Sequence, residues 1–178
     1  MRFFLVFLFV SIYSFAQTKV KDTITYSEYN KLHWSDFKDK VPADTKYSAS
    51  VCSGMSYKWS YSIANNIPEF AYEVEAKLYR NLSWSKYTEG KEEVLSHEQL
   101  HFDISELYAR KFRKQLSEYE VSRNVRKDVG DMYENLEKER LKFQLMYDSI
   151  TEHSLNKEAQ IEWNLKVNRL LNEYDAYK

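Results

Sequence analysis

VLSHEQLHFDI, residues 94–104, is the segment around which the rest of this 178-residue chain is organised. It holds His97 and His101 four residues apart, and residues with this spacing stand one above the other on the same face of a helix. Their imidazoles can therefore bind the same metal ion. Apolar residues share that side of the helix, so the two histidines are expected to point into the core: Val94, Leu100, Ile104, Leu107 and Tyr108.

Glu98 follows the first histidine directly, where it can meet a water on the metal without binding the metal itself. Zn²⁺ lowers the pKa of a bound water from about 15.7 toward about 7, and a nearby carboxylate can then take the proton. The arrangement His-Glu-x-x-His is typical of zinc metalloproteases. The alternative is a set of polar residues on a charged helix, but two of only four histidines take this register. We therefore expect one Zn²⁺ per chain, with Glu98 as the general base.

Periodicity on either side of this segment predicts the remaining elements. Strict alternation of apolar and polar residues predicts strands at 49–63 and 70–78 that form an antiparallel hairpin, after a short strand and loop within 22–37. The charged face of the second strand suits a sheet edge, where an extended peptide can pair, or equally an ordinary solvated face. Helical spacing predicts helices from a Thr88 cap to about 119, from 125 to about 148, and from an Asn156 cap to about 174.

These elements predict an α+β fold. A small antiparallel sheet from the N-terminal half packs on three helices from the C-terminal half. We find no internal repeat, low-complexity tract or linker in the sequence, so residues 17–178 are expected to form a single domain.

A catalytic zinc site usually has three protein ligands and one open position, so a third ligand is needed. His153, in the predicted loop between the second and third helices, is the first candidate, with Asp148 as a carboxylate that orients it. Tyr147 is a candidate donor to the oxyanion. The alternative third ligands are glutamates of the second predicted helix: Glu134, Glu137 and Glu139.

Three further polar residues have weaker assignments. Asp103 and Glu106 follow the histidine motif but lie off the face of His97 and His101, so supporting or salt-bridge roles are expected for them. His33 lies beside a tryptophan and is expected to be a packed side chain rather than a ligand.

Three longer sequence segments accompany the motif: residues 97–111, HEQLHFDISELYARK; residues 32–37, LHWSDF; and residues 147–154, YDSITEHS, followed by Gln160 and Trp163. Together they resemble a bacterial family of secreted proteins of unknown function that are described as predicted zinc-dependent proteases. The resemblance spans nearly all of the mature chain and implies a zincin-like peptidase domain. A glycine often follows the downstream histidine in that family, whereas Ser154 follows His153 here.

The N-terminus reads as a secretory signal peptide over residues 1–16, with Arg2, a short apolar run and a Ser-Phe-Ala cleavage site. That run is shorter than the roughly 20 residues of a membrane span, so we expect a soluble periplasmic or extracellular protein. Removal of Arg2 leaves 25 basic and 27 acidic residues, a balance that does not favour nucleic acid as a partner. The lone Cys52 excludes an internal disulfide.

The sequence thus supports two functional hypotheses. The first is a secreted zinc-dependent hydrolase, most simply a metallopeptidase that acts on a peptide or protein. The second is a noncatalytic envelope protein, in which a structural zinc joins the helices and the sheet binds a protein partner. Glu98 favours the first hypothesis because a structural site needs no base. The absence of a substrate-pocket signature in the sequence favours the second.

Overall fold

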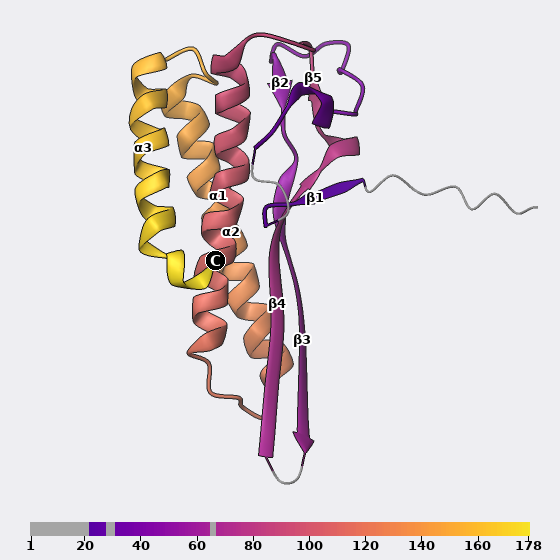
Figure 1. Cartoon of the computed structure of the whole chain (residues 1–178), viewed down its shortest axis with the longest axis vertical. Helices are drawn as coiled ribbons and strands as arrows, with labels where there is room; N and C mark the ends of the chain where they lie inside the picture. The colour runs from indigo at the N-terminus through magenta and orange to yellow at the C-terminus, as the bar shows by residue number, and fades with distance from the viewer. Residues whose placement is uncertain (1–21, 28–30, 65–66) are drawn as a thin grey trace, which may run out of the picture.

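The computed structural model describes residues 22–27, 31–64 and 67–178. It confirms the α+β class: a small antiparallel sheet from the N-terminal half packs against helices from the C-terminal half (Figure 1). The predicted signal peptide, residues 1–16, lies outside the described residues. Within the described part of the chain, no helix is both long and apolar enough to cross a membrane.

The main sheet is dominated by a long hairpin. Strands β3 (Ser53–Ala64) and β4 (Ile67–Tyr79) pair over their whole length, and β1 (Thr23–Thr25) pairs with the last three residues of β4. In the described residues the order is β1-β4-β3, so β4 is flanked on both sides at its C-terminal end and is an edge only nearer the hairpin turn. The turn end of the hairpin extends past the helices (Figure 1).

The predicted strand at 49–63 is wrong in one respect, because it is broken into two pieces. Residues Ala49–Ser50 form β2, which pairs with β5 (Trp84–Ser85) in a separate small sheet. The break falls at Val51 and Cys52, whose backbone N–H groups donate to the side chains of Glu98 (2.7 Å) and Ser83 (2.9 Å). Side-chain acceptors thus take the place of a neighbouring strand at this point.

The helices are α1 (Glu92–Ser117), α2 (Val125–Thr151) and α3 (Lys157–Glu173). Short 3-10 turns lie at Trp34–Asp36 (η1), Arg80–Leu82 (η2) and Asp175–Tyr177 (η3). The Thr88 cap is wrong, because Gly90 and Lys91 take left-handed φ angles of 63° and 55° and α1 begins only at Glu92. The Asn156 cap is confirmed: its side chain accepts from the backbone N–H of Ala159 at 3.1 Å.

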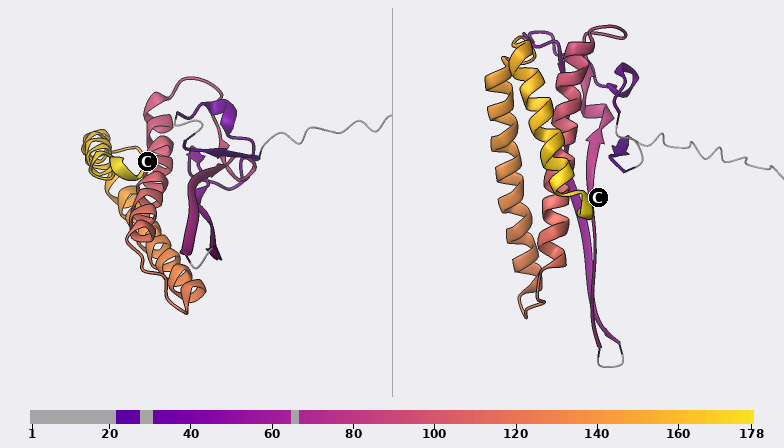
Figure 2. Two further views of the ribbon diagram at one scale, coloured as in Figure 1. Left: turned by 60° about the horizontal axis from the view of Figure 1, so that its bottom comes forward. Right: turned by 60° about the vertical axis from the view of Figure 1, so that its left-hand side comes forward.

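Helix α1 is the central element of the core. The sheet covers one side of it, and α2 and α3 cover the other, as the two views of Figure 2 show. Its side chains are consequently buried almost all round, and Phe102, Ile104, Leu107 and Phe112 are 0% exposed. Because α1 is enclosed in this way, polar groups on it must find partners inside the protein.

Candidate metal centre

Two helices bring three potential metal ligands together. His97 and His101 lie on α1, and Asp148 lies in the last turn of α2. The Nε2 atoms of His97 and His101 are 3.1 and 2.9 Å from the same oxygen, Oδ1 of Asp148. The three ligand atoms lie within 4.8 Å of one another, so this group could hold a metal ion.

Gln160 of α3 fixes the other ring nitrogen of His97. Its Oε1 lies 3.0 Å from Nδ1, and its Nε2 donates to Oδ1 of Asn164 at 3.0 Å. This second bond orients the amide so that its oxygen faces the ring. An amide oxygen can only accept, so Nδ1 carries the proton and Nε2 keeps its lone pair toward Asp148. A neutral His97 therefore presents Nε2 to the group that could hold a metal ion.

Tyr147 contacts both His97 and Gln160 and helps to hold them in place. Its ring stacks on His97 with 4.6 Å between centroids, and its hydroxyl donates toward Gln160 Oε1 (2.8 Å) and the His97 carbonyl (3.2 Å). Burial raises the pKa of this phenol, so it stays neutral. The side chain is fully buried. The structure therefore places Tyr147 where it positions His97, and its role as an oxyanion donor stays a prediction.

Glu98 lies beside the three-ligand group, in the wall of the same cavity. It is 5% exposed, and its Oε2 accepts the N–H of Val51. Burial raises the pKa of Glu98, an effect that the nearby imidazoles of His101 and His97 oppose. Glu98 is therefore a poorly solvated carboxyl group next to the residues that could hold a metal ion.

His153 lies at the mouth of the site. Its Nδ1 is 3.7 Å from Oδ1 of Asp148, its ring packs on Tyr47 at 4.6 Å, and its side chain is 46% exposed. Glu152, His153 and Ser154 all take left-handed φ angles, of 50°, 52° and 77°. Glycine adopts this conformation without strain, and none of these three residues is a glycine.

A cavity of about 590 Å³ opens over these groups. The segment 46–51, which includes β2, forms one wall, and the segment 152–155 after α2 forms another. The two histidines, Glu98 and Asp148 line it from α1 and α2. A volume of this size is in the range of ligand-binding sites.

Without a metal ion, the histidines and carboxylates of the site shift one another's pKa values. Burial lowers the pKa of His97, but the hydrogen bond to Asp148 and the charge of Glu98 outweigh it, so the pKa is raised overall. Burial raises the pKa of Asp148, but the bonds from His101 and His97 hold it well below its usual range. A cation among these groups, either a proton or a metal ion, therefore compensates the carboxylate.

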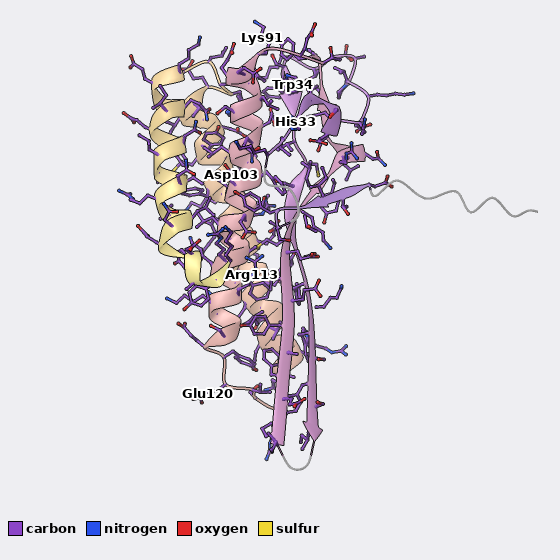
Figure 3. The ribbon with its side chains drawn as sticks, viewed as in Figure 1. His33, Trp34, Lys91, Asp103, Arg113 and Glu120 are labelled. Atoms are coloured by element: carbon purple, nitrogen blue, oxygen red, sulfur yellow. The ribbon has the colours of Figure 1, made fainter. Side chains whose placement is uncertain are left out.

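Other predicted residues lie elsewhere. Asp103 accepts from Gln99 of the same helix (2.8 Å) and from the Tyr26 hydroxyl (3.1 Å). The second bond attaches the N-terminal segment to α1, and burial raises the pKa of Asp103 to about 6. Figure 3 labels Asp103 along α1 and His33 in the segment before η1. The structure does not bring Asp103 into the cavity lining.

The glutamates considered as alternative ligands have surface positions or other partners. Glu134 pairs with Lys138, Glu137 binds Arg140, and Glu139 is exposed. None of the three belongs to the group that could hold a metal in the described residues. The salt-bridge role expected for Glu106 is confirmed, because its Oε1 lies 3.0 Å from Nε of Arg110.

Sequence reasoning missed two contributions. It treated Asp148 only as a partner of His153, and it gave Gln160 no role at the site. A signal was present for Gln160: helical spacing puts it on the apolar stripe of α3 with Trp163 and Val167, and it is buried there. A polar residue on a buried stripe requires a hydrogen-bond partner.

The model of a family of bacterial proteins of unknown function, DUF922, matches residues 16–154. The match covers most of the chain and includes all three potential ligands and His153, so the chain belongs to this family. No curated protein and no solved structure matches it.

Proposed function

We propose that this member of a bacterial family of unknown function is an exported zinc-dependent hydrolase that cleaves peptide or amide bonds. The observation that carries the proposal is the convergence of His97, His101 and Asp148 in a cavity wall beside the buried Glu98. The predicted signal peptide directs the protein to the periplasm or the exterior. A peptide or protein is the proposed substrate, with Glu98 as the general base.

The donor set fits Zn²⁺. Zinc binds imidazole nitrogen and carboxylate oxygen at about 2.0–2.2 Å in tetrahedral geometry, which sets neighbouring ligand atoms about 3.3 Å apart. The two distances from Asp148 Oδ1 to the histidines, 3.1 and 2.9 Å, are within a few tenths of this value. We therefore assign Asp148 as the third ligand. His153, whose Nδ1 is 3.7 Å from Oδ1 of Asp148, is the alternative ligand.

Glu98 is the residue that we assign to proton transfer. A bound zinc ion polarises a carbonyl and makes a water more acidic. The N–H of Val51 holds Oε2 of Glu98 in place, so Oε1 is the oxygen that accepts the proton of the attacking water and returns it to the leaving nitrogen. Burial raises the pKa of this carboxyl, which makes it a stronger base than a solvated glutamate.

The second hypothesis, a structural zinc in a noncatalytic protein, is supported by His153. If this histidine also binds the ion, four protein ligands close the site. The ion then joins α1 to the end of α2 and the loop after it, and the sheet is left to bind a protein partner. The two hypotheses differ in whether a coordination position stays open.

Substitution of Glu98 by Gln separates the hypotheses. Glutamine keeps an oxygen that accepts from Val51, so the fold and about one zinc per chain, measured by elemental mass spectrometry, should be retained. Hydrolysis of casein by the zinc-loaded protein should fall about 10²–10⁴-fold. Glu93→Gln, an exposed position on the same helix, is the matched control and should keep full activity. Equal activity of the wild type and Glu98→Gln would refute the proposed hydrolysis with Glu98 as the general base.

His153→Ala tests the alternative ligand. With Asp148 as the third ligand, zinc stays at about one per chain in this variant. Loss of zinc from it, together with no hydrolysis by the unmodified protein and a sharp fall in melting temperature on zinc removal, would establish the structural site instead.

A further inference from the structure

Two strongly exposed leucines border the cavity of the metal centre. Leu145 is 69% exposed and Leu155 is 78% exposed, and both line the same cavity as Glu98 and the proposed ligands. Single exposed apolar residues are common on protein surfaces. Two of them beside a group of convergent polar residues form the combination found in ligand-binding sites.

Both leucines are held by backbone structure. Leu145 lies three residues before Asp148 on α2, so the two side chains share a helical face. Leu155 follows the left-handed residues 152–154, and its N–H donates to the carbonyl of Glu152 at 3.3 Å. The next residue, Asn156, donates to the carbonyl of Thr151 at 2.9 Å. The folded backbone around the site therefore holds both leucines in their exposed positions.

The rest of the lining does not favour a charged ligand. Lys46 and Glu152, which have opposite charges, both line the cavity, so neither sign dominates there. The small apolar Ala49 and Val94 add to the uncharged surface. A bound group that covers the two leucines gains most if it is itself apolar.

We propose that Leu145 and Leu155, together called the apolar rim, bind a large apolar side chain of the substrate next to the bond that is cleaved. The proposal rests on the hydrolase function proposed above and adds a substrate class to it: peptides with leucine, phenylalanine or a similar residue beside the scissile bond. Substrates with alanine or a charged residue at that position are poor.

Peptide cleavage gives the first test. In a fluorogenic peptide series that varies only the residue on either side of the scissile bond, leucine should exceed alanine about tenfold in kcat/KM, because each buried methylene favours binding several-fold. The double substitution Leu145→Gln with Leu155→Gln should abolish this preference. Leu165→Gln is the matched control: Leu165 is 67% exposed on α3 and is not part of the cavity lining. A leucine preference that survives in the double variant overturns the proposal.

Ligand binding gives a second test that does not depend on activity. N-acetyl-leucinamide, titrated against zinc-loaded Glu98→Gln protein, should shift the methyl NMR signals of Leu145 and Leu155 and bind about tenfold more tightly than N-acetyl-alaninamide. The signals of Leu165 should not move. If no peptide is cleaved but this selectivity is found, the proposed hydrolase function is refuted, whereas binding of an apolar side chain by the apolar rim is supported. Equal affinity for the two amides refutes the rim, whatever the protein cleaves.

Discussion

Helix α1 carries two buried polar clusters that are built in opposite ways. The candidate metal centre combines His97 and His101 with Asp148. Farther along the helix, Glu106, Arg110 and Arg113, together called the ion cluster, meet between the sheet and the C-terminal turn; Figure 3 labels Arg113 there. Glu106 and Arg110 are 3% and 5% exposed, as deeply buried as His97 at 3%.

The ion cluster is complete without any added ion. Oε1 of Glu106 accepts from both arginines, at 3.0 and 2.9 Å. Other N–H groups of the same two arginines donate to the carbonyls of Leu171, Val74 and Tyr177 at 2.8–3.0 Å. Oδ1 of Asp175 lies 3.4 Å from Nη1 of Arg110, so two carboxylates face the two guanidinium groups, and the cluster joins α1 to the sheet and to the C-terminus.

The metal centre lacks such a balance. With His97 Nδ1 protonated toward Gln160, the Nε2 lone pair faces a carboxylate oxygen, so acceptor faces acceptor. Only a cation between these atoms removes the repulsion. The comparison teaches that burial and polarity alone do not indicate a binding site. A binding site is indicated when the protein's own groups leave one charge uncompensated.

The largest effect should come from breaking the ion cluster. Glu106→Leu removes the buried carboxylate that both arginines share and leaves only the exposed Asp175 near Arg110, so the free energy of unfolding should fall by about 3–5 kcal/mol, measured by urea denaturation. Glu134→Leu, which breaks the exposed pair with Lys138, should change it by less than about 1 kcal/mol. Similar losses in both variants would contradict the ion cluster as described.

Zinc should stabilise the protein only through the metal centre. At a free concentration 100 times the Kd, binding to the folded state adds about 2.7 kcal/mol of stability, visible as a rise in melting temperature. His101→Ala should abolish the rise. Asp103→Asn should keep it, because the amide oxygen still accepts from Gln99 and Tyr26 outside the cavity. A full zinc response in His101→Ala would show that the metal binds elsewhere.

Gln160 should tune the metal affinity without contacting the ion. Gln160→Leu removes the acceptor that fixes the proton on Nδ1 of His97, and the zinc affinity should fall about 10–100-fold. Gln160→Glu restores an acceptor and should recover most of the affinity. The measurement is competition with a chromophoric chelator. Unchanged affinity in the leucine variant would remove Gln160 from the metal centre.

The pH dependence should have opposite signs with and without zinc. The pKa of His97 in the metal-free protein is raised above 6.5, so the stability from its bond to Asp148 is present below that pH and is lost as pH rises through the folded pKa. Zinc requires the unprotonated ring, so the zinc-induced rise in melting temperature should grow from pH 6 to pH 8. Asp148→Asn should flatten both trends. Parallel trends would exclude proton and metal competition at His97.

Much of the fold could be predicted because its signals are local. The alternation in residues 70–78 and the spacing of apolar residues in α1, α2 and α3 depend only on strand and helix geometry. The Asn156 cap was predicted for the same reason. The Thr88 cap failed because the left-handed backbone at Gly90 and Lys91 separates that residue from the helix, and propensity does not reveal such a detour.

Contacts between segments that are distant in the chain could not be predicted from local sequence patterns. The break at Val51 depends on Glu98, which is 47 residues away in the chain. Asp103 accepts from the hydroxyl of Tyr26, 77 residues away, because the N-terminal segment crosses α1 at that point. Neither arrangement leaves a periodic signal in the residues concerned.

The sequence by itself determined that His97 and His101 share one helical face with Glu98 beside them, because a four-residue spacing has the same consequence in any helix. The tertiary structure alone decided that Asp148 completes the group and that Gln160 orients His97. These residues lie 51 and 63 positions from His97, and their meeting depends on how α2 and α3 pack around α1. That packing follows from the shape of whole buried faces, which no short motif encodes.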